Sequence, residues 1–598
     1  MNNGEITQRL KELKIEDFIW VIYIGIIFFS WFANSLERKY FVFNDVESRD
    51  KYRKVMTGIF IVLVIVYFYF LRESYNDLKD LKPTDSDKRK ELVTLSFIAS
   101  LLIFISGIII LYIVVSDEYI CDNIRSLMQK DILGATKQDK KIVIDYGGPN
   151  VAKPLHVGHL RTAIIGQAIN NILKFVGNET IGDVHLGDIG TQMGQVIYGI
   201  LQDFPNTKYE DINFDLDYLN KTYPKISALC KEDEKVREKC LEITKQNQDG
   251  DPNYRILWKK INEVSVSDIK RIYDYLDVHF DLWYGESHAY KYFDEMMSFI
   301  EKQGIIKIDD GAKIIDIKEK DDKMDYPPCM LQKSDGAYLY ATSDLGTIWQ
   351  REKDFHPDNI IYVVDNRQSM YFTQVFRAAK KAHIYDGVLE HYGNGTVNGS
   401  DNKPFKTREG GTLKLEQLIE EVKKEFINMR EENKHMDKED LDKIVNAIIK
   451  FADLQNDLER NYIFDIKKFS EVNGKTGPYI LYTIVRIKSI LNRYAESGKS
   501  LEACEIQNAS SASEKALMLE VAKFNQVIEN AYEELAPHKI CAYIYDLSNV
   551  FNRFYHETKI LSEEDETKQA GYIALLTLTK KVLEACIDVL GFEAPERM

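Results

Sequence analysis

Three long apolar runs open the chain, and none of them contains a charged residue. They occupy residues 18–36, 55–71 and 92–115. About 20 apolar residues cross a bilayer as a helix, so the third run is long enough and the other two lie near the lower limit. A cleaved signal peptide is not expected, because the first run lacks a small-residue cleavage site and two more runs follow. The pattern predicts a membrane segment over residues 1–120 with three transmembrane helices.

Beyond these runs, short buried segments alternate with helical periodicity. The polar and mixed stretch 117–140 is expected to be a juxtamembrane helix or a linker, and the linker is assigned to 121–140. A buried strand is predicted at 141–147, an amphipathic helix at 160–176 and a second strand from Asn178. Strand, glycine-bearing loop, helix and strand together predict a βαβ unit of a parallel sheet.

A charged and helical region interrupts this pattern over about 205–335, with a strand pair near 307–317. It is expected to be an insertion. Strand character returns at 336–340 and 359–364, which predicts the second half of the sheet. From residue 413 helical periodicity dominates, and the polar segment SEVNGKT predicts a break between modules. The expected domains are an α/β catalytic domain of Rossmann type at 141–470 and an all-α domain at 471–598.

Charge and cysteine content narrow the function classes. The net charge of −16 argues against indiscriminate nucleic-acid binding but leaves room for a local basic groove. The seven cysteines include no CxxC pair, so neither a zinc knuckle nor a redox motif is predicted. Reduced thiols and no dedicated metal site are expected.

The motif HVGH, residues 156–159, lies where the first predicted strand passes into the helix. Ligands of βαβ units bind at the carboxyl end of the strand, where the helix N-terminus favours phosphate. Gly158 leaves space for an adenine ring against the backbone. His156 and His159 can donate hydrogen bonds to phosphate oxygens. Two core or capping histidines on an ordinary helix are the alternative for so short a motif.

Around this motif the chain resembles the class I arginyl-tRNA synthetases in a series of ordered blocks. They are PNVAKPLHVGHLRT (149–162), VHLGDIGTQMG (184–194), YLYATSDLGT (338–347), YVVDNRQSMYFTQVF (362–376), KPFKTREGGTLKL (403–415), TGPYILYTIVRIKSIL (476–491), YDLSNVFNRFYHETKIL (545–561) and the terminal FEAPERM. The resemblance covers about residues 141–598. It implies a class I Rossmann-type catalytic domain followed by a helical anticodon-binding bundle.

The resemblance implies an arginine–tRNA ligase. ATP and L-arginine would form arginyl-adenylate, and the arginine would pass to the 3′ end of tRNA(Arg). Mg²⁺ would accompany the phosphates of ATP. A monomer is expected. The alternative is a weakly active membrane-tethered arginine sensor or tRNA-binding scaffold, but the intact phosphate-contacting residues favour the enzyme.

The catalytic and ATP-binding residues follow from the matched blocks. His156, Gly158, His159 and Lys406 match ATP-binding positions. The loop FKTREG departs from the lysine-serine form common in class I synthetases and supplies Lys406 and Arg408 as cations. Lys153 matches an upstream lysine that can supply the missing positive charge. A solvated loop lysine is the alternative for Lys153.

Arginine and tRNA contacts are implied in the same way. Tyr340 and Asp344 match the guanidinium-binding pair, and Gln368 a third partner, because a guanidinium needs a carboxylate and further acceptors. Asp145 and Asn150 match groups that hold the α-amino and carboxylate end. A helix N-cap after Thr342 and Ser343 is the alternative for Asp344. The residues implied in tRNA binding are Tyr479, Tyr482, Arg486 and Met598. An aromatic core stripe is the alternative there.

The membrane segment stands where members of this family usually carry a soluble domain that contacts the tRNA, which puts tRNA affinity in doubt. The loops 37–54 and 72–91 carry equal numbers of basic residues, so the positive-inside rule gives no orientation. ATP and tRNA are cytosolic, so a multi-pass membrane protein with its catalytic domain facing the cytoplasm is expected. Three crossings would place Met1 on the other side, and a first segment that does not fully cross is the alternative.

Overall fold

The computed structural model describes residues 3–43, 46–115, 117–334, 336–399, 403, 413–429 and 435–598. The chain divides into two compact units, Met1–Asn123 and Ile124–Met598.

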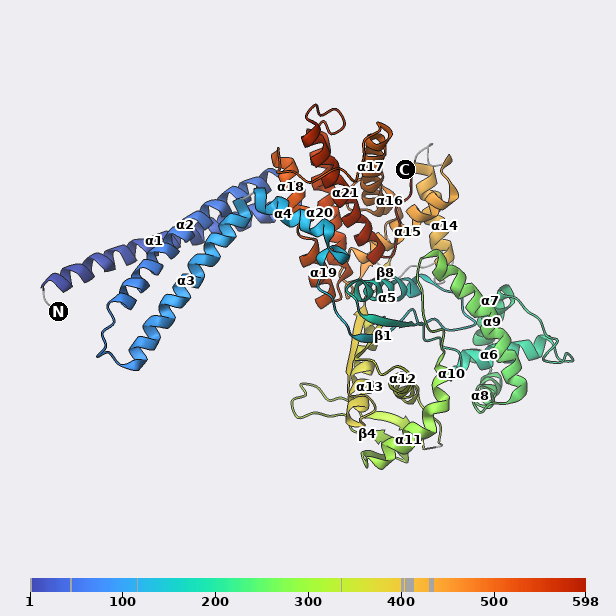
Figure 1. The fold of residues 1–598 in the computed structure, drawn as a ribbon. Helices are drawn as coiled ribbons and strands as arrows, with labels where there is room; N and C mark the ends of the chain where they lie inside the picture. The colour runs from blue at the N-terminus through green and yellow to red at the C-terminus, as the bar shows by residue number, and fades with distance from the viewer. Residues whose placement is uncertain are drawn as a thin grey trace. The chain divides into compact units, whose positions relative to one another are not determined.

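The first unit consists of long helices (Figure 1, blue). They are α1 (Asn3–Phe43), α2 (Val46–Lys79) and α3 (Asp87–Val115), and α2 packs against both of the others. The stretches Asp17–Leu36, Lys54–Lys79 and Asp87–Ile109 are long and apolar enough to cross a membrane. The predicted apolar helices are therefore present.

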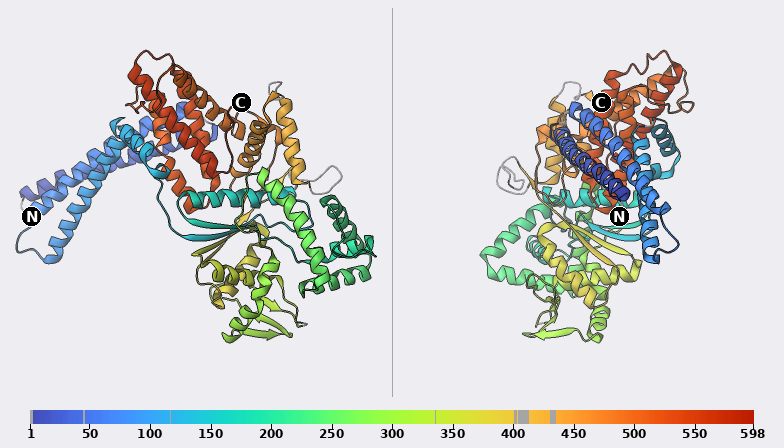
Figure 2. Two further views of the ribbon diagram at one scale, coloured as in Figure 1. Left: turned by 45° about the vertical axis from the view of Figure 1, so that its right-hand side comes forward. Right: turned by 90° about the vertical axis from the view of Figure 1, so that its left-hand side faces the viewer.

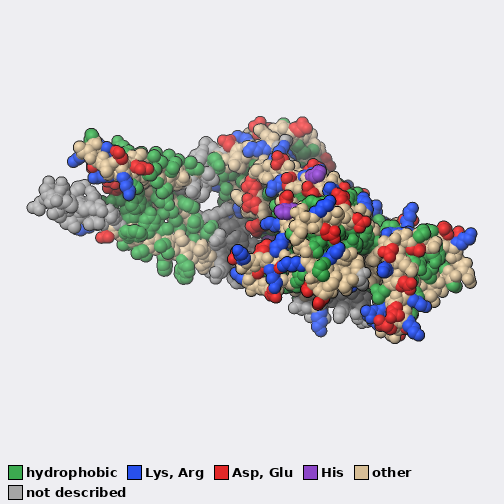
Figure 3. Space-filling model, turned by 90° about the horizontal axis from the view of Figure 1, so that it is seen from below, with side chains coloured by type: hydrophobic (Ala, Val, Ile, Leu, Met, Phe, Trp, Pro, Cys, Tyr) green, Lys and Arg blue, Asp and Glu red, His purple; other side chains and the backbone are tan. Residues whose placement is uncertain are grey.

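Large apolar side chains of this unit point outward. Trp20, Phe28 and Trp31 on α1 are each about two-thirds exposed (67%, 66% and 68%). Figure 3 shows hydrophobic side chains over much of the surface of these helices. An apolar surface of this extent is unusual on a protein in water and suits contact with lipid.

Parallel strands form the central sheet of the second unit (Figure 2). Their order is β2 (Glu179–Asp183), β1 (Lys141–Tyr146), β6 (Asn359–Asp365) and β7 (Val388–Asn394). Val143 of β1 pairs with Ile181 on one side and Ile360 on the other. The chain leaves β1 for β2 and later returns to the opposite side of β1, so the strand order reverses there. Open α/β sheets bind ligands at such a point, at the carboxyl ends of the strands. The predicted parallel sheet is confirmed.

The helix after β1 is α5 (Val157–Phe175), and it is buried over most of its surface. It lies between the sheet and the helices α14 (Leu415–Met429), α15 (Lys438–Leu454), α19 (Phe524–Glu533), α20 (Pro537–Glu557) and α21 (Glu566–Val589). The expectation of an amphipathic helix with one solvent face was therefore wrong. The helix also starts three residues earlier than predicted, because His156 caps it.

The expected insertion is present, mainly as helices. It contains α7 (Leu216–Glu232), α8 (Glu234–Gln248), α9 (Pro252–Tyr275), α10 (Glu286–Ala289) and α11 (Phe293–Lys302). The helix before it, α6 (Thr191–Asp203), packs against α7 and α8. The predicted strand pair is β3 (Ile306–Asp309) with β4 (Ala312–Ile315), and β5 (Cys329–Gln332) extends it to a small antiparallel sheet.

The prediction of a strand at 336–340 was wrong. Tyr338 makes a single bridge to Gln332 of β5, and Tyr340 already begins α12 (Tyr340–Phe355). The alternating aromatic residues of this short segment imitate a strand, but they lead into the helix that carries Asp344. The chain then continues through β6, α13 (Ser369–Lys381) and β7.

The stretch expected to be a juxtamembrane helix or a linker is helical in its first part, which agrees with the first alternative. It forms α4 (Asp117–Gln129) and the 3₁₀ turn Asp131–Gly134. Ile124 and Leu127 are buried, and the guanidinium of Arg125 donates to the carbonyl of Ile506 at 2.6 Å. Residues from 124 onward thus belong to the second unit, because their apolar side chains and hydrogen bonds are satisfied within it.

The C-terminal part of the second unit is helical. After a two-residue strand pair, β8 (Val397–Asn398) with β9 (Tyr462–Ile463), it contains α16 (Ile466–Ser470), α17 (Gly477–Glu496) and α18 (Ala512–Val521), followed by α19, α20 and α21. The segment between Ser470 and Gly477 is not helical, at the break that SEVNGKT predicts. All seven cysteines are buried and none is in a disulfide.

Candidate functional site

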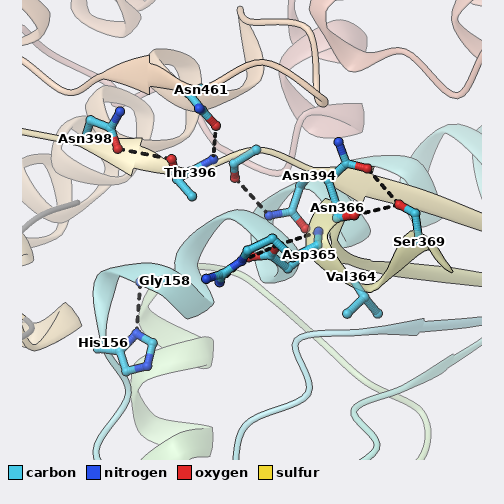
Figure 4. Close-up of polar contacts among 12 residues, drawn as sticks. His156, Gly158, Val364, Asp365, Asn366, Ser369, Asn394, Thr396, Asn398 and Asn461 are labelled. Carbon is cyan, nitrogen blue, oxygen red and sulfur yellow. Dashed lines mark hydrogen bonds and ion pairs between the residues drawn. The ribbon is translucent and has the colours of Figure 1, made fainter. Parts of the chain in front are cut away.

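The two histidines of HVGH lie at the N-terminus of α5, at the carboxyl edge of the sheet. His156 is the N-cap residue, and its Nδ1 accepts a hydrogen bond from the backbone N–H of Gly158 at 3.0 Å (Figure 4). The backbone N–H of His156 donates to Nδ1 of His159 at 3.1 Å. The two rings stack with their centres 3.8 Å apart. Two core or capping histidines were the alternative, and both histidines do take part in capping this helix.

Both rings are neutral near pH 7. Burial, together with the neighbouring His156 and Lys153, lowers the pKa of His159 to about 3. Burial and then Lys153 also lower the pKa of His156. In each ring Nδ1 accepts a hydrogen bond from a backbone N–H, so the ring's own proton lies on Nε2. The pair therefore offers two fixed Nε2–H donors.

Gly158 is required by this arrangement. A Cβ at this position would lie 2.7 Å from Cε1 and 2.8 Å from Nδ1 of His156. Because such contacts are closer than real Cβ atoms show, any other residue would displace the His156 ring. The open space above an exposed glycine also remains available to a planar ligand.

Lys153 lies close to the histidines and is half-buried. Its Nζ is 4.8 Å from the centre of the Tyr223 ring, a cation–π contact. Its charge contributes to the lowered pKa of both His156 and His159. Lys153 is thus packed beside the site, which disfavours the alternative of a freely solvated loop lysine.

The other two predicted cations, Lys406 and Arg408, lie outside the described residues. The chain that follows them is described again from Leu413, whose carbonyl accepts the backbone N–H of Val157 at 3.1 Å. The C-terminal end of the block 403–415 is therefore attached beside the histidine motif.

Asp344 lies in the second turn of α12 and receives a hydrogen bond from the hydroxyl of Tyr371. The N-cap of α12 is Leu339, so the alternative of a capping role for Asp344 was wrong. Burial raises the pKa of Asp344, although the hydrogen bond from Tyr371 opposes this. Tyr340 begins the same helix one turn earlier and is 66% exposed. The predicted pair thus consists of the Asp344 carboxylate, which is bound by Tyr371, and the Tyr340 phenol, which is exposed to solvent.

Asp145 lies at the end of β1, where a buried arginine holds it. Nη2 of Arg351 donates to Asp145 at 2.5 Å and to Asp183 at 2.7 Å, and Arg351 is fully buried. His185 lies within reach of both carboxylates, a grouping that could hold a metal ion. Arg351 already supplies the positive charge to both acids, which disfavours a metal there.

Asn150 and Gln368 occupy different surroundings. Oδ1 of Asn150 accepts from Nε2 of Gln192 at 3.3 Å, and a Cβ at Gly187 would lie only 2.4 Å from that oxygen. Asn150 is thus oriented by the neighbouring block 184–194. Gln368 lies at the start of α13 and is exposed.

Sequence reasoning missed several charged residues of this site. Burial raises the pKa of Glu286 to about 7; the charge of His185 opposes the shift, and the charges of Asp344 and Asp188 add to it. Glu286 and Arg351 come from the insertion and from α12, and no short motif marks either of them. Tyr371 lies inside the block 362–376, but the sequence does not show that its hydroxyl contacts Asp344 in the fold.

A cavity of about 280 Å³ opens at the carboxyl ends of β6 and β7. It is lined by Asn366, Ser369, Thr373, Phe376, Leu389, His391, Gly393 and Glu459. Figure 4 shows Asn366 and Ser369 near the end of β6, together with the histidine motif at the start of α5. Open α/β sheets bind ligands at this edge.

The predicted tRNA-binding residues lie on α17 and face α20. The hydroxyl of Tyr479 donates to Asn549 at 2.6 Å and accepts from Asn552 at 3.0 Å. The guanidinium of Arg486 lies 4.6 Å from the ring centre of Tyr482 and 4.9 Å from that of Tyr555. Tyr479, Tyr482 and Arg486 are all half-buried, so they are not an ordinary core stripe.

The chain end lies against the same helix. Glu596 forms an ion pair with Lys488 of α17 at 2.7 Å, and Met598 follows it, half-buried. The structure thus brings the terminal residues to the helix that carries Tyr482 and Arg486.

Comparisons with known proteins agree with this geometry. Residues 123–466 match the family model of the catalytic domain of class I tRNA synthetases (R), and residues 480–598 match the DALR anticodon binding domain. An arginine–tRNA ligase of Agathobacter rectalis is 49% identical over 491 residues, which cover 78% of this chain and 82% of the relative. One of Alkaliphilus oremlandii is 44% identical over 502 residues, 81% of this chain and 85% of the relative.

A solved structure is similar over the same range. The arginyl-tRNA synthetase of Plasmodium falciparum superposes with a TM-score of 0.68 at 25% identity, and the match covers 81% of this chain and 83% of that one. Residues 1–122 precede both family-model matches. The family model, the identities and the shared fold confirm the resemblance seen in the sequence: the chain belongs to the arginyl-tRNA synthetases, the class I arginine–tRNA ligases.

Proposed function

We propose that this ligase activates L-arginine with the histidine pair and the buried carboxylates described above, and that it does so while anchored in a membrane. The observation that carries the first part is that Nδ1 of both His156 and His159 accepts a backbone N–H, which leaves each Nε2 as a donor at the carboxyl edge of the sheet.

In the first step a carboxylate oxygen of arginine attacks the α-phosphorus of ATP. The bond from that phosphorus to the bridging oxygen breaks, and pyrophosphate leaves. Two neutral Nε2–H groups can donate hydrogen bonds to phosphate oxygens as negative charge develops on them, and no proton transfer is needed. Lys153 adds a positive charge beside them. Mg²⁺ bound to the phosphates of ATP would supply further positive charge there, without a dedicated protein site.

The acidic side chains at the carboxyl edge of the sheet would recognise arginine. The guanidinium has five donors in a planar fork and pairs best with carboxylates. Asp344 supplies one, held by Tyr371, and Tyr340 and Gln368 are further partners. Asp145, oriented by Arg351, and Asn150, oriented by Gln192, would hold the α-amino and carboxylate end.

In the second step a hydroxyl of the terminal ribose of tRNA(Arg) attacks the adenylate carbonyl, and AMP leaves. The anticodon would be read by the surface of α17, where Tyr482 and Arg486 stack. Stacking on aromatic and guanidinium planes is the usual way to bind unpaired bases. Met598, two residues after the Glu596 that pairs with Lys488 of α17, is a further proposed contact. The monomeric state stays a prediction.

The membrane anchor is the second part of the proposal. Three apolar helices with outward Trp and Phe side chains support it. The substrates ATP and tRNA place the catalytic part in the cytoplasm, and three crossings then place the N-terminus on the other side. The connection at residues 80–86, where Asp85 pairs with Arg89 of α3 at 3.3 Å, would lie outside.

Arginine-dependent exchange of pyrophosphate into ATP, with tRNA(Arg) present, tests the proposed chemistry. The full chain in detergent should catalyse it, and omission of arginine should abolish it. An arginine sensor or tRNA scaffold would bind its ligand without exchange, so specific arginine binding with no exchange would reject the enzyme.

A further inference from the structure

Arg161 lies two residues after His159 on α5, and its guanidinium is buried between separate parts of the chain. Its Nε donates to Asp453 of α15 at 3.3 Å, and its Nη1 donates to the carbonyl of Arg460 at 2.6 Å. The guanidinium carbon lies 5.2 Å from the ring centre of Tyr462 on β9. Arg161 is 1% and Asp453 0% exposed. A cation buried this deeply is stable only with such partners.

Arg161 contacts the segment 458–463. This segment in turn forms hydrogen bonds with the chain that follows β7. The backbone N–H of Gly395 donates to the carbonyl of Leu458 at 2.9 Å, and that of Thr396 donates to Oδ1 of Asn461 at 2.7 Å (Figure 4). A Cβ at Gly395 would lie 2.6 Å from the carbonyl carbon of Arg460, so the two backbones are in close contact.

This segment also lines the cavity of about 280 Å³ at the carboxyl ends of β6 and β7, which we assign to the ATP site. Glu459, next to the carbonyl that Arg161 binds, lines it together with Gly393 at the end of β7. The opposite side of the ATP site is the histidine motif, one helical turn from Arg161. A single buried side chain therefore connects the two sides.

We propose that Arg161 is a positioning residue, which sets the distance between the histidine motif and the β7–Glu459 side of the ATP site. This inference rests on the proposed function. Misplacement of reacting groups by about 1 Å can cost about 100-fold in rate. Loss of Arg161 should therefore act on ATP and leave arginine binding unchanged, because Asp344 and Tyr371 lie on α12 and α13, which Arg161 does not contact in the described structure.

Variants of the Arg161–Asp453 ion pair separate an effect on the reaction rate from an effect on Tm. Removing one partner of a buried pair is destabilising, whereas replacing both with apolar residues is often neutral. Asp453→Leu should lower Tm because Arg161 stays charged and unpaired. The double variant Arg161→Met with Asp453→Leu should recover most of that Tm. We expect its adenylation rate to remain about 10- to 100-fold low, with a raised KM for ATP and a KM for arginine within about twofold.

Lys450→Met is the matched control. Lys450 is a fully buried lysine on the same helix as Asp453, where burial lowers its pKa to about 7, and it binds the carbonyls of Asp277 and Gly591. Its loss should lower Tm but leave the rate per folded molecule unchanged. Arg161→Lys is the second variant, in case the double variant does not fold. It keeps the charge, but it cannot hold both Asp453 and Arg460 in a fixed fork, so the ATP defect should persist.

A double variant that recovers Tm and rate together would overturn the positioning role, as would an equal rise in both KM values. A full-rate Arg161→Lys enzyme would also overturn it. Inactivity of the unmodified chain in the same exchange assay would instead count against the proposed function itself.

Discussion

The backbone N–H of His156 donates to Nδ1 of His159 at 3.1 Å. This contact leaves the proton of His159 on Nε2, and the matching bond from Gly158 does the same for His156. The spacing H-x-x-H is what allows it, since residues three apart at a helix N-terminus can form a reciprocal cap. The motif thus builds its own rigid pair of donors before any substrate binds.

Substitution of His159 should show which nitrogen acts on the substrate. His159→Ala should lower adenylation by about 10²–10³-fold, the cost of one fixed donor. His159→Gln can place an amide N–H near the position of Nε2, whereas His159→Asn can reach only the position of Nδ1. Single-turnover adenylate formation should therefore rank Gln above Asn. Equal rates for the two variants, or a fully active alanine variant, would reject the assignment.

The low pKa of His159 predicts a contribution to stability that depends on pH. The folded form keeps the ring neutral down to about pH 3, while the unfolded chain takes up a proton near pH 6.5. The contribution is therefore complete above pH 6.5 and is lost as pH falls from 6.5 toward 3. The Tm advantage of the unmodified protein over His159→Gln should shrink between pH 7 and pH 5. A constant or growing advantage would contradict the buried neutral ring.

Asp344→Asn tests the guanidinium pocket. The change keeps the size and the acceptor for Tyr371 but removes the charge. A charged hydrogen bond contributes about 1.5–3 kcal/mol, so the KM for arginine should rise by about 10- to 100-fold. The KM for ATP should change little. If the KM for arginine stays within about twofold, Asp344 does not meet the guanidinium.

Glu286 should make arginine binding sensitive to pH. Its pKa is about 7 without ligand, and a bound guanidinium favours the ionised carboxylate. Arginine affinity should then rise with pH up to about 7 and level off above it. Calorimetry at pH 6, 7 and 8 measures this, with Glu286→Gln as the control that should lose the dependence. The same slope in both proteins would assign the titration to another group.

Sequence reasoning could predict what is encoded locally. The strand before HVGH, the helix after it and the apolar helices all follow from patterns within about 25 residues. Identification of His156, Gly158 and His159 required only their spacing at that junction and the surrounding blocks.

It failed where a charged residue is buried or where partners are far apart in the chain. Arg351 and Arg161 appear as polar positions in helical patterns, which normally indicates exposure, yet both are buried against acids. The polar composition of the segment 121–140 gave no sign that Ile124 and Leu127 are buried. α5 appeared amphipathic because its polar residues Arg161, Gln167 and Asn170 are buried in hydrogen bonds rather than exposed to solvent.

Arginylation of added tRNA by sealed vesicles tests the central claim most directly, namely that this ligase works on the cytoplasmic side of a membrane that it spans. Vesicles are prepared inside-out and right-side-out from cells that make the full chain. Inside-out vesicles should charge tRNA(Arg) with arginine and ATP supplied outside, and right-side-out vesicles should do so only after detergent opens them. Activity that washes into the soluble fraction, or activity confined to intact right-side-out vesicles, would contradict it.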